Sequence, residues 1–135
     1  MRKKITGTVS GAVLALAFSG WMASSALAGE ITSIAILAPE MGTDMGWNQQ
    51  GVDAAKAAGE AAGVKVVVAE NLGYGDVRPT LRELAEDGAG LLIAHASGYN
   101  TAAPEIGAEM NIPVAIVDSP DKLAEGKIAD YTAAG

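Results

Sequence analysis

Short apolar runs alternate with helical patterns along this chain, and that alternation constrains its fold more than any other feature. The runs are rich in aliphatic and β-branched residues and cover residues 31–38, 64–70, 90–95 and 113–118, with a weaker run at 127–131. Nearly continuous apolar runs of this length are typical of strands that are buried on both faces of a parallel sheet.

Helical patterns fill the three intervals between the first four runs. Along residues 47–62, small residues recur on one helical face and charged residues on the other, and Gly63 is well placed to end that helix. Asp76 can cap a second helix that has Pro79 in its first turn, where proline is tolerated. A third helix is expected over residues 102–110.

The order of these elements predicts an α/β fold, namely an open, doubly wound parallel sheet with helices on both faces. Right-handed crossovers and a switch point beside the first strand favour the strand order 2-1-3-4-5. Ligands of such sheets bind outside the carboxyl ends of the strands. The loops after the first, third and fourth strands are therefore expected to border a ligand cleft.

Those loops bring an aromatic ring together with polar groups. Trp47 offers a flat apolar surface, with the carboxylate of Asp44 and the amide of Asn48 beside it, which suits a flat polar ligand. The alternative is structural: Trp47 covers the core, and Asp44 or Thr43 caps the helix. The predicted ligand-binding residues are Asp44, Trp47, Asn48, Ser97, Gly98, Tyr99 and Asp118.

The sequence offers little for catalysis. It has no cysteine and one histidine, His95, so a multi-histidine metal site is excluded and a Ser-His-Asp triad would need that residue. No glycine-rich dinucleotide motif or phosphate loop follows the first strand. We expect no catalytic residue, cofactor or metal, and we expect His95 to be a satisfied, partly buried histidine. A hydrolase that uses Asp44 or Asp118 with His95 stays the alternative.

The first 28 residues have the pattern of a secretory signal peptide. A basic start at residues 2–4 precedes an apolar stretch at 7–18 and the small-x-small site Ala26-Leu27-Ala28. The apolar stretch is too short to span a membrane. We expect residues 29–135 to be released into the periplasm or the medium, without a lipid anchor because no cysteine follows.

The charge of residues 29–135 limits the partners. They hold six Lys and Arg residues against 16 Asp and Glu residues, a formal charge of −10. A surface of this sign argues against nucleic acid or an anionic membrane as a partner.

Four short motifs, taken together, are similar to one known family. They are Thr43-Asp44-Met45-Gly46-Trp47-Asn48-Gln49, Val66-Val67-Val68-Ala69-Glu70-Asn71, Ser97-Gly98-Tyr99 and Ile116-Val117-Asp118. Their succession resembles the basic-membrane-protein family of ABC-transporter substrate-binding proteins, in its purine-nucleoside-receptor-like group. The resemblance covers residues 29–135, and its first motif is the most specific.

The resemblance implies a lobe of the type I periplasmic binding fold. Two such lobes close on a nucleoside-like ligand and deliver it to a membrane permease and its ATPase. Trp47 would stack on the base, Asp44 and Asn48 would hydrogen-bond it, and Ser97, Gly98 and Asp118 would line the rest of the cleft. Residues 29–135 would be the N-terminal lobe alone, because Gly135 stands where the crossover to the second lobe begins.

Two further alternatives stay open. The first is a sugar-binding protein of the same fold. The second is a non-functional fragment, because a lone lobe encloses only half of a ligand and a domain of this size has little surplus stability.

Overall fold

The computed structural model describes residues 30–117 and, as backbone, residues 128–131. The predicted signal peptide and Asp118 lie outside the described residues. The elements are β1 (Ser33–Leu37), α1 (Trp47–Ala62), β2 (Lys65–Ala69), α2 (Arg78–Glu86), β3 (Leu91–Ala94), the 3-10 helix η1 (Ser97–Tyr99), α3 (Ala102–Met110), β4 (Val114–Val117) and β5 (Ile128–Tyr131).

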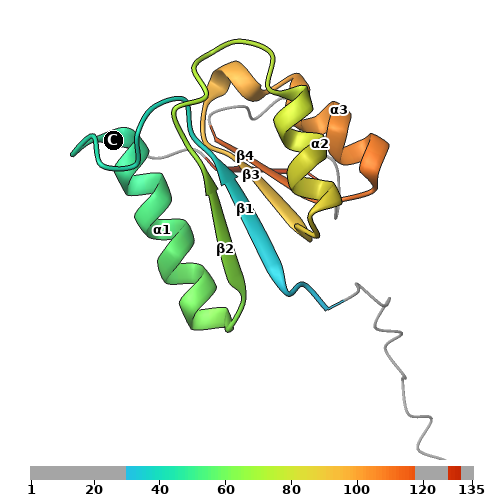
Figure 1. Cartoon of the computed structure of the whole chain (residues 1–135), viewed down its shortest axis with the longest axis horizontal. Coiled ribbons are helices and arrows are strands. Elements are labelled where there is room, and N and C mark those ends of the chain that lie inside the picture. Colours follow the sequence, from blue (N-terminus) through green and yellow to red (C-terminus); the bar gives the residue numbers. More distant parts are fainter. Residues whose placement is uncertain (1–29, 118–127, 132–135) are drawn as a thin grey trace, which may run out of the picture.

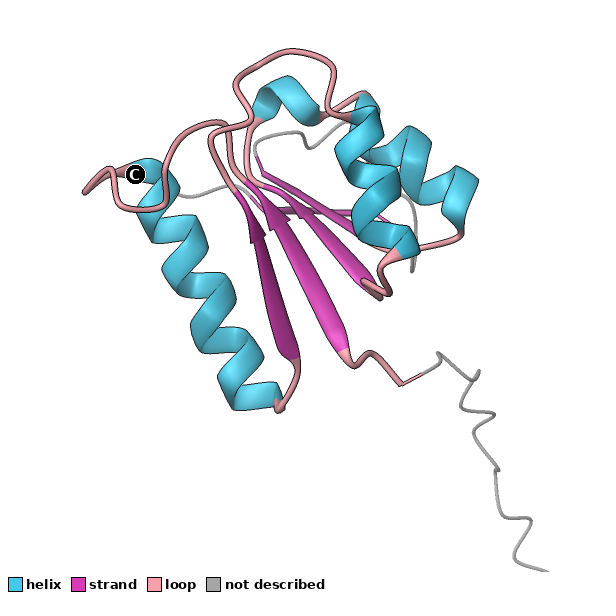
Figure 2. Cartoon of the chain, viewed as in Figure 1, coloured by secondary structure: helices cyan, strands magenta, loops and turns pink. Residues whose placement is uncertain are grey.

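The strands form one parallel sheet in the order β2-β1-β3-β4-β5, which confirms the predicted topology. β1 lies between β2 and β3, and Ile34 pairs with Val66 on one side and with Leu91 on the other. The carboxyl ends of β1 and β3 therefore lie side by side, as Figure 2 shows.

Helices cover both faces of the sheet. α1 packs on one face, against β1 and β2, and α2 and α3 lie together on the other (Figure 1). The main core lies under α2 and α3, and its largest members are Leu37, Leu81, Leu84, Leu92, Tyr99, Ile106 and Ile116.

A glycine brings α1 close to the sheet. A Cβ added at Gly59 would overlap the side chain of Val66 in β2, so only glycine fits at this spacing. At the end of the helix Gly63 has φ 68°, and its N–H donates to the carbonyl of Glu60. The prediction that Gly63 ends the helix is thus confirmed.

Two arginine–glutamate pairs join α2 to α3. Arg78 donates from Nη2 to Glu105 Oε2 at 2.7 Å, and Arg82 donates from Nη2 to Glu109 Oε2 at 2.8 Å. The two arginines are one helical turn apart, as are the two glutamates, so the two exposed pairs lie side by side along α2 and α3. In the described part of the chain, no helix is long and apolar enough to cross a membrane.

Candidate functional site

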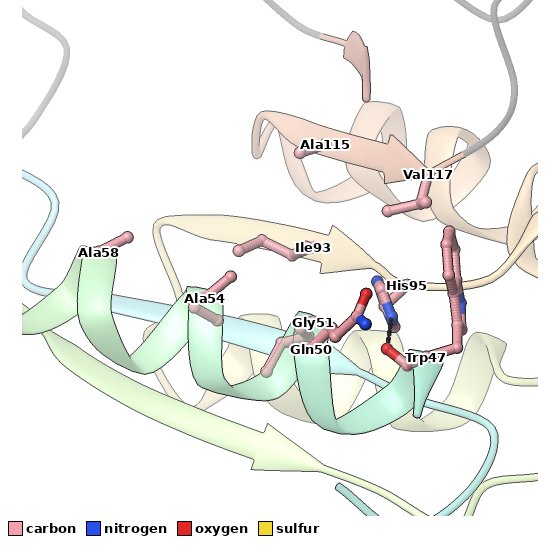
Figure 3. Close-up of a pocket in the computed structure, with 11 residues that line it drawn as sticks. Trp47, Gln50, Gly51, Ala54, Ala58, Ile93, His95, Ala115 and Val117 are labelled. Carbon is pink, nitrogen blue, oxygen red and sulfur yellow. Dashed lines mark hydrogen bonds between the residues drawn. The ribbon is translucent and has the colours of Figure 1, made fainter. Parts of the chain in front are cut away.

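Two aromatic rings meet where the chain leaves β1 and β3. Trp47 is the first residue of α1, and His95 follows the last residue of β3. Their rings stack, with centroids 4.9 Å apart and planes inclined by 18° (Figure 3). Trp47 is 38% exposed, so it presents an aromatic residue at the surface, at the predicted edge of the sheet.

His95 is held from two directions. It is 7% exposed, its Nε2 lies 2.8 Å from the carbonyl oxygen of Trp47, and its backbone N–H donates to Leu37. Because a carbonyl oxygen only accepts, Nε2 carries a hydrogen and donates it. His95 is thus hydrogen-bonded as expected, is more deeply buried than the partly buried histidine that the sequence predicted, and shows no geometry of a hydrolytic base.

Asp44 organises the start of α1. Its Oδ1 accepts hydrogen bonds from the N–H groups of Gly46 and Gln49, at 2.8 and 3.0 Å. Its Oδ2 accepts from the side-chain and backbone nitrogens of Asn48, at 2.8 and 3.2 Å. These donors, the Asn48 side chain first, lower the pKa of Asp44 to about 2. The structural alternative, in which Asp44 caps the helix, therefore describes what this side chain does here.

Asn48 is buried beneath that loop. It is 4% exposed, and its Nδ2 is committed to Asp44. Its Oδ1 is buried and has no hydrogen-bond partner among the described residues. An orphaned buried acceptor is costly, so a further hydrogen-bond donor that reached this oxygen would be stabilising.

The loop after β3 divides its predicted residues between surface and core. Ser97 and Gly98 are exposed in η1, whereas Tyr99 is fully buried and its hydroxyl donates to the carbonyl of Gly73 at 2.6 Å. Burial raises the pKa of Tyr99 to about 12. Tyr99 thus belongs to the core, and the ring that lies beside Gly98 is that of Tyr74, which is 68% exposed.

A groove that the sequence analysis did not predict runs along α1. It has a volume of about 470 Å³ and lies between α1 and the side of β1, β3 and β4 that faces it. Trp47 and His95 stand at one end and Ala58 at the other, with Ile93 and Ala115 between them (Figure 3). The sequence feature that could have predicted this groove is the apolar character of β3 and β4 on both faces of the sheet. Because α2 and α3 cover only one face, the apolar residues on the other face are left to line a groove.

The structure brings Asp44, Trp47 and Asn48 together at the start of α1 and places His95 against Trp47. Ser97 and Gly98 follow from the neighbouring strand, and Asp118 lies outside the described residues. Within residues 30–117, no three Asp, Glu or His side chains gather in a way that could hold a metal ion.

Comparison with known proteins finds similar folds among solved structures. No protein-family model and no curated protein matches the chain. Among solved structures, an ABC transporter solute-binding protein from Conexibacter woesei matches over 75% of this chain, with a TM-score of 0.66 and 18% identity. A second, from Aeropyrum pernix, matches over 74%, with a TM-score of 0.63 and 16% identity. At such identities the likeness shows the fold alone.

The matches cover only part of those neighbours. This chain corresponds to 35% of the Conexibacter protein and 28% of the Aeropyrum protein. The α/β sheet described above is therefore similar to one portion of each of these solute-binding proteins.

Proposed function

We propose that this chain is a ligand-binding lobe of an exported solute-binding protein, and that its ligand is a nucleoside-like small molecule. The observation that carries the proposal is the indole of Trp47. It lies at the carboxyl edge of a parallel sheet, is backed by a buried ring and stays 38% exposed. The likeness of the fold to two ABC transporter solute-binding proteins supports the class of protein.

An aromatic surface favours a ligand that contains a flat ring. Base–aromatic stacking is worth ~1–3 kcal/mol per base in single-stranded nucleic-acid binders. Ser97 and Gly98 are exposed at the neighbouring strand end and offer a hydroxyl and backbone groups to such a ligand. Asp118 would add a carboxylate from the end of β4.

Asp44 and Asn48, the polar residues at the start of α1, are less available to a ligand than Trp47. Four N–H groups already occupy both oxygens of Asp44. A carboxylate has about four lone-pair sites, so a ligand donor would have to replace one of these bonds. On this proposal Asp44 chiefly fixes the start of α1, and Asn48 Oδ1 is the acceptor that a ligand donor could satisfy after a small rearrangement.

The proposal includes a second lobe, a membrane partner and a place in the cell. A groove on one lobe buries half of a ligand, and tight sites bury most of it. A second lobe would supply the other wall of the cleft, and a permease with its ATPase would receive the ligand. Cleavage after Ala28 would leave the protein free in the periplasm or the medium, without a lipid anchor.

The test uses the fluorescence of Trp47. The chain has two tryptophans, at positions 21 and 47, so Trp47 is the sole tryptophan of residues 29–135. Residues 29–135 are made as a protein and titrated with adenosine, guanosine, inosine and ribose, each up to millimolar concentration. The same protein joined to the second lobe that the proposal requires is titrated in parallel.

Stacking predicts a saturable change in Trp47 emission with nucleosides and little change with ribose. A response to ribose alone would support the sugar-binding alternative. Folded protein with an unchanged emission in every titration, in both versions, would overturn the proposal.

A further inference from the structure

We infer that His95 is a positioning residue, which fixes the orientation of the Trp47 ring. The absence of a side chain at Gly51 leaves the room that the imidazole needs for this role. The consequence for ligand binding rests on the proposed function. The geometric role does not, because it can be measured without any ligand.

His95 holds both parts of Trp47 at once. Its ring lies nearly parallel to the indole, with centroids 4.9 Å apart. The same ring donates from Nε2 to the backbone carbonyl of Trp47 at 2.8 Å. One buried side chain at the end of β3 therefore restrains the backbone and the side chain of the first residue of α1, and Figure 3 shows both contacts.

Gly51 supplies the room for this arrangement. It lies one helical turn after Trp47, so the two residues share a face of α1. A Cβ added there would overlap three atoms of the imidazole, namely Cε1, Nε2 and Cδ2. Glycine is unfavourable inside a helix, and here the volume of the missing methyl group is occupied by the His95 ring.

A fixed indole matters for binding because an ordered side chain need not be ordered again by the ligand. Immobilising a side chain on binding lowers affinity by an amount that corresponds to roughly 2- to 10-fold. We therefore expect a variant with a loosened Trp47 ring to bind nucleosides roughly 2- to 10-fold more weakly, even though His95 itself lies behind the ring.

The first measurement needs no ligand. Residues 29–135 are made as the parent and as His95→Ala, His95→Phe, Gly51→Ala and the double variant G51A/H95A. Near-ultraviolet circular dichroism reports how firmly Trp47 is held, acrylamide quenching reports its exposure, and far-ultraviolet dichroism checks the fold.

His95→Ala should weaken the near-ultraviolet signal of Trp47 and raise its quenching. His95→Phe should preserve most of the signal, because a ring face is kept while the hydrogen bond is lost. Gly51→Ala should act like His95→Ala, because its methyl group displaces the imidazole. The double variant should add little to either single change, because both act through the same contact.

The second measurement is the nucleoside affinity of each variant, with ribose as the comparison. If the parent binds no nucleoside, the proposed function fails while the spectroscopic comparison still decides the role of His95. If His95→Ala does not fold, Gly51→Ala and His95→Phe carry the test. The inference is wrong if folded His95→Ala or folded Gly51→Ala holds Trp47 with the dichroism and quenching of the parent.

Discussion

The indole of Trp47 and the imidazole of His95 stack 4.9 Å apart although 48 positions separate them in the sequence. The sheet makes this possible, because β1 and β3 are neighbours and the two residues follow their carboxyl ends. The pair joins a ring that faces the surface to a ring that is buried, so a change at His95 is expected to act on a ligand through Trp47.

Replacing Trp47 should remove most of the binding surface of the proposed site. We expect Trp47→Ala to weaken nucleoside binding by roughly 10- to 100-fold, because stacking on an aromatic is worth ~1–3 kcal/mol. Calorimetry on residues 29–135 joined to the second lobe that the proposal requires measures the loss, and far-ultraviolet dichroism checks the fold. Trp47→Phe is the matched control and should keep most of the affinity. Equal affinity of the parent and Trp47→Ala would remove the stacking role.

Asp44 should contribute stability that depends on acid pH. Its pKa is lowered from 3.8 to about 2 in the folded protein, mainly by the Asn48 side chain. A lowered pKa means that the contribution is complete above about pH 4 and is lost as the pH falls through about 2. Asp44→Asn should therefore melt below the parent at neutral pH, and the gap should narrow between about pH 4 and pH 2.

The control for that comparison is Asp53→Asn, which removes the same charge from an exposed position of α1. Melting temperatures of the three proteins are followed by circular dichroism across this range. A gap between the parent and Asp44→Asn that stays constant from neutral pH to pH 2 would argue against the capping role.

The hydroxyl of Tyr99 should stabilise the fold, and this stabilisation should be lost at alkaline pH. Tyr99→Phe removes a 2.6 Å hydrogen bond to the carbonyl of Gly73, which should cost about 1 kcal/mol in urea unfolding at neutral pH. Burial raises the pKa of Tyr99 from 10.0 to about 12. Because the pKa is raised on folding, the stability that the hydroxyl contributes is fully present below about pH 10 and is lost as the pH rises through about 12. The phenylalanine variant should lack this loss, whereas Tyr74→Phe, at an exposed position, should show it, at a slightly lower pH because Tyr74 also raises the pKa of Tyr99.

The close contact of α1 with β2 should make Gly59 sensitive to a methyl group. Gly59→Ala gains about 1 kcal/mol of helix propensity but overpacks against Val66, which typically costs about 1–3 kcal/mol. We expect a net loss of stability. The double variant G59A/V66A should be more stable than the sum of the single changes, with a coupling above about 0.5 kcal/mol in urea unfolding. Simple additivity would show that the two positions do not touch.

Export should remove the first 28 residues. The basic start, the short apolar stretch and Ala26-Leu27-Ala28 predict cleavage before Gly29. N-terminal sequencing of the exported product should begin at Gly29 or within a residue or two of it. A product that keeps Met1 and sediments with membranes would refute the prediction.

Much of the fold is readable from local patterns. The helix predicted over residues 47–62 is α1 with the same bounds, and the strand predicted at 31–38 is β1, shortened to Ser33–Leu37. These elements can be predicted because side-chain periodicity and turn residues determine local structure over a few positions of the sequence. The strand order follows from handedness rules and needs no contact between distant residues.

The site is readable only in part. The place of Trp47 follows from its position after the first strand, but its stack on His95 does not, because that contact depends on the room that the missing Cβ of Gly51 leaves for the imidazole. The inward turn of Tyr99 depends on the 3-10 helix η1, for which Ser97-Gly98-Tyr99 shows no periodic pattern. The four hydrogen bonds of Asp44 depend on backbone angles in the loop, including φ 58° at Met45.

The order β2-β1-β3-β4-β5 allows the sheet to assemble in the sequence in which the chain is made. β1 emerges first and becomes an interior strand, β2 then joins one of its edges, and β3, β4 and β5 add outward from the other. No strand has to enter between two that are already paired. Every partial sheet built in this order therefore presents an edge that the next strand completes.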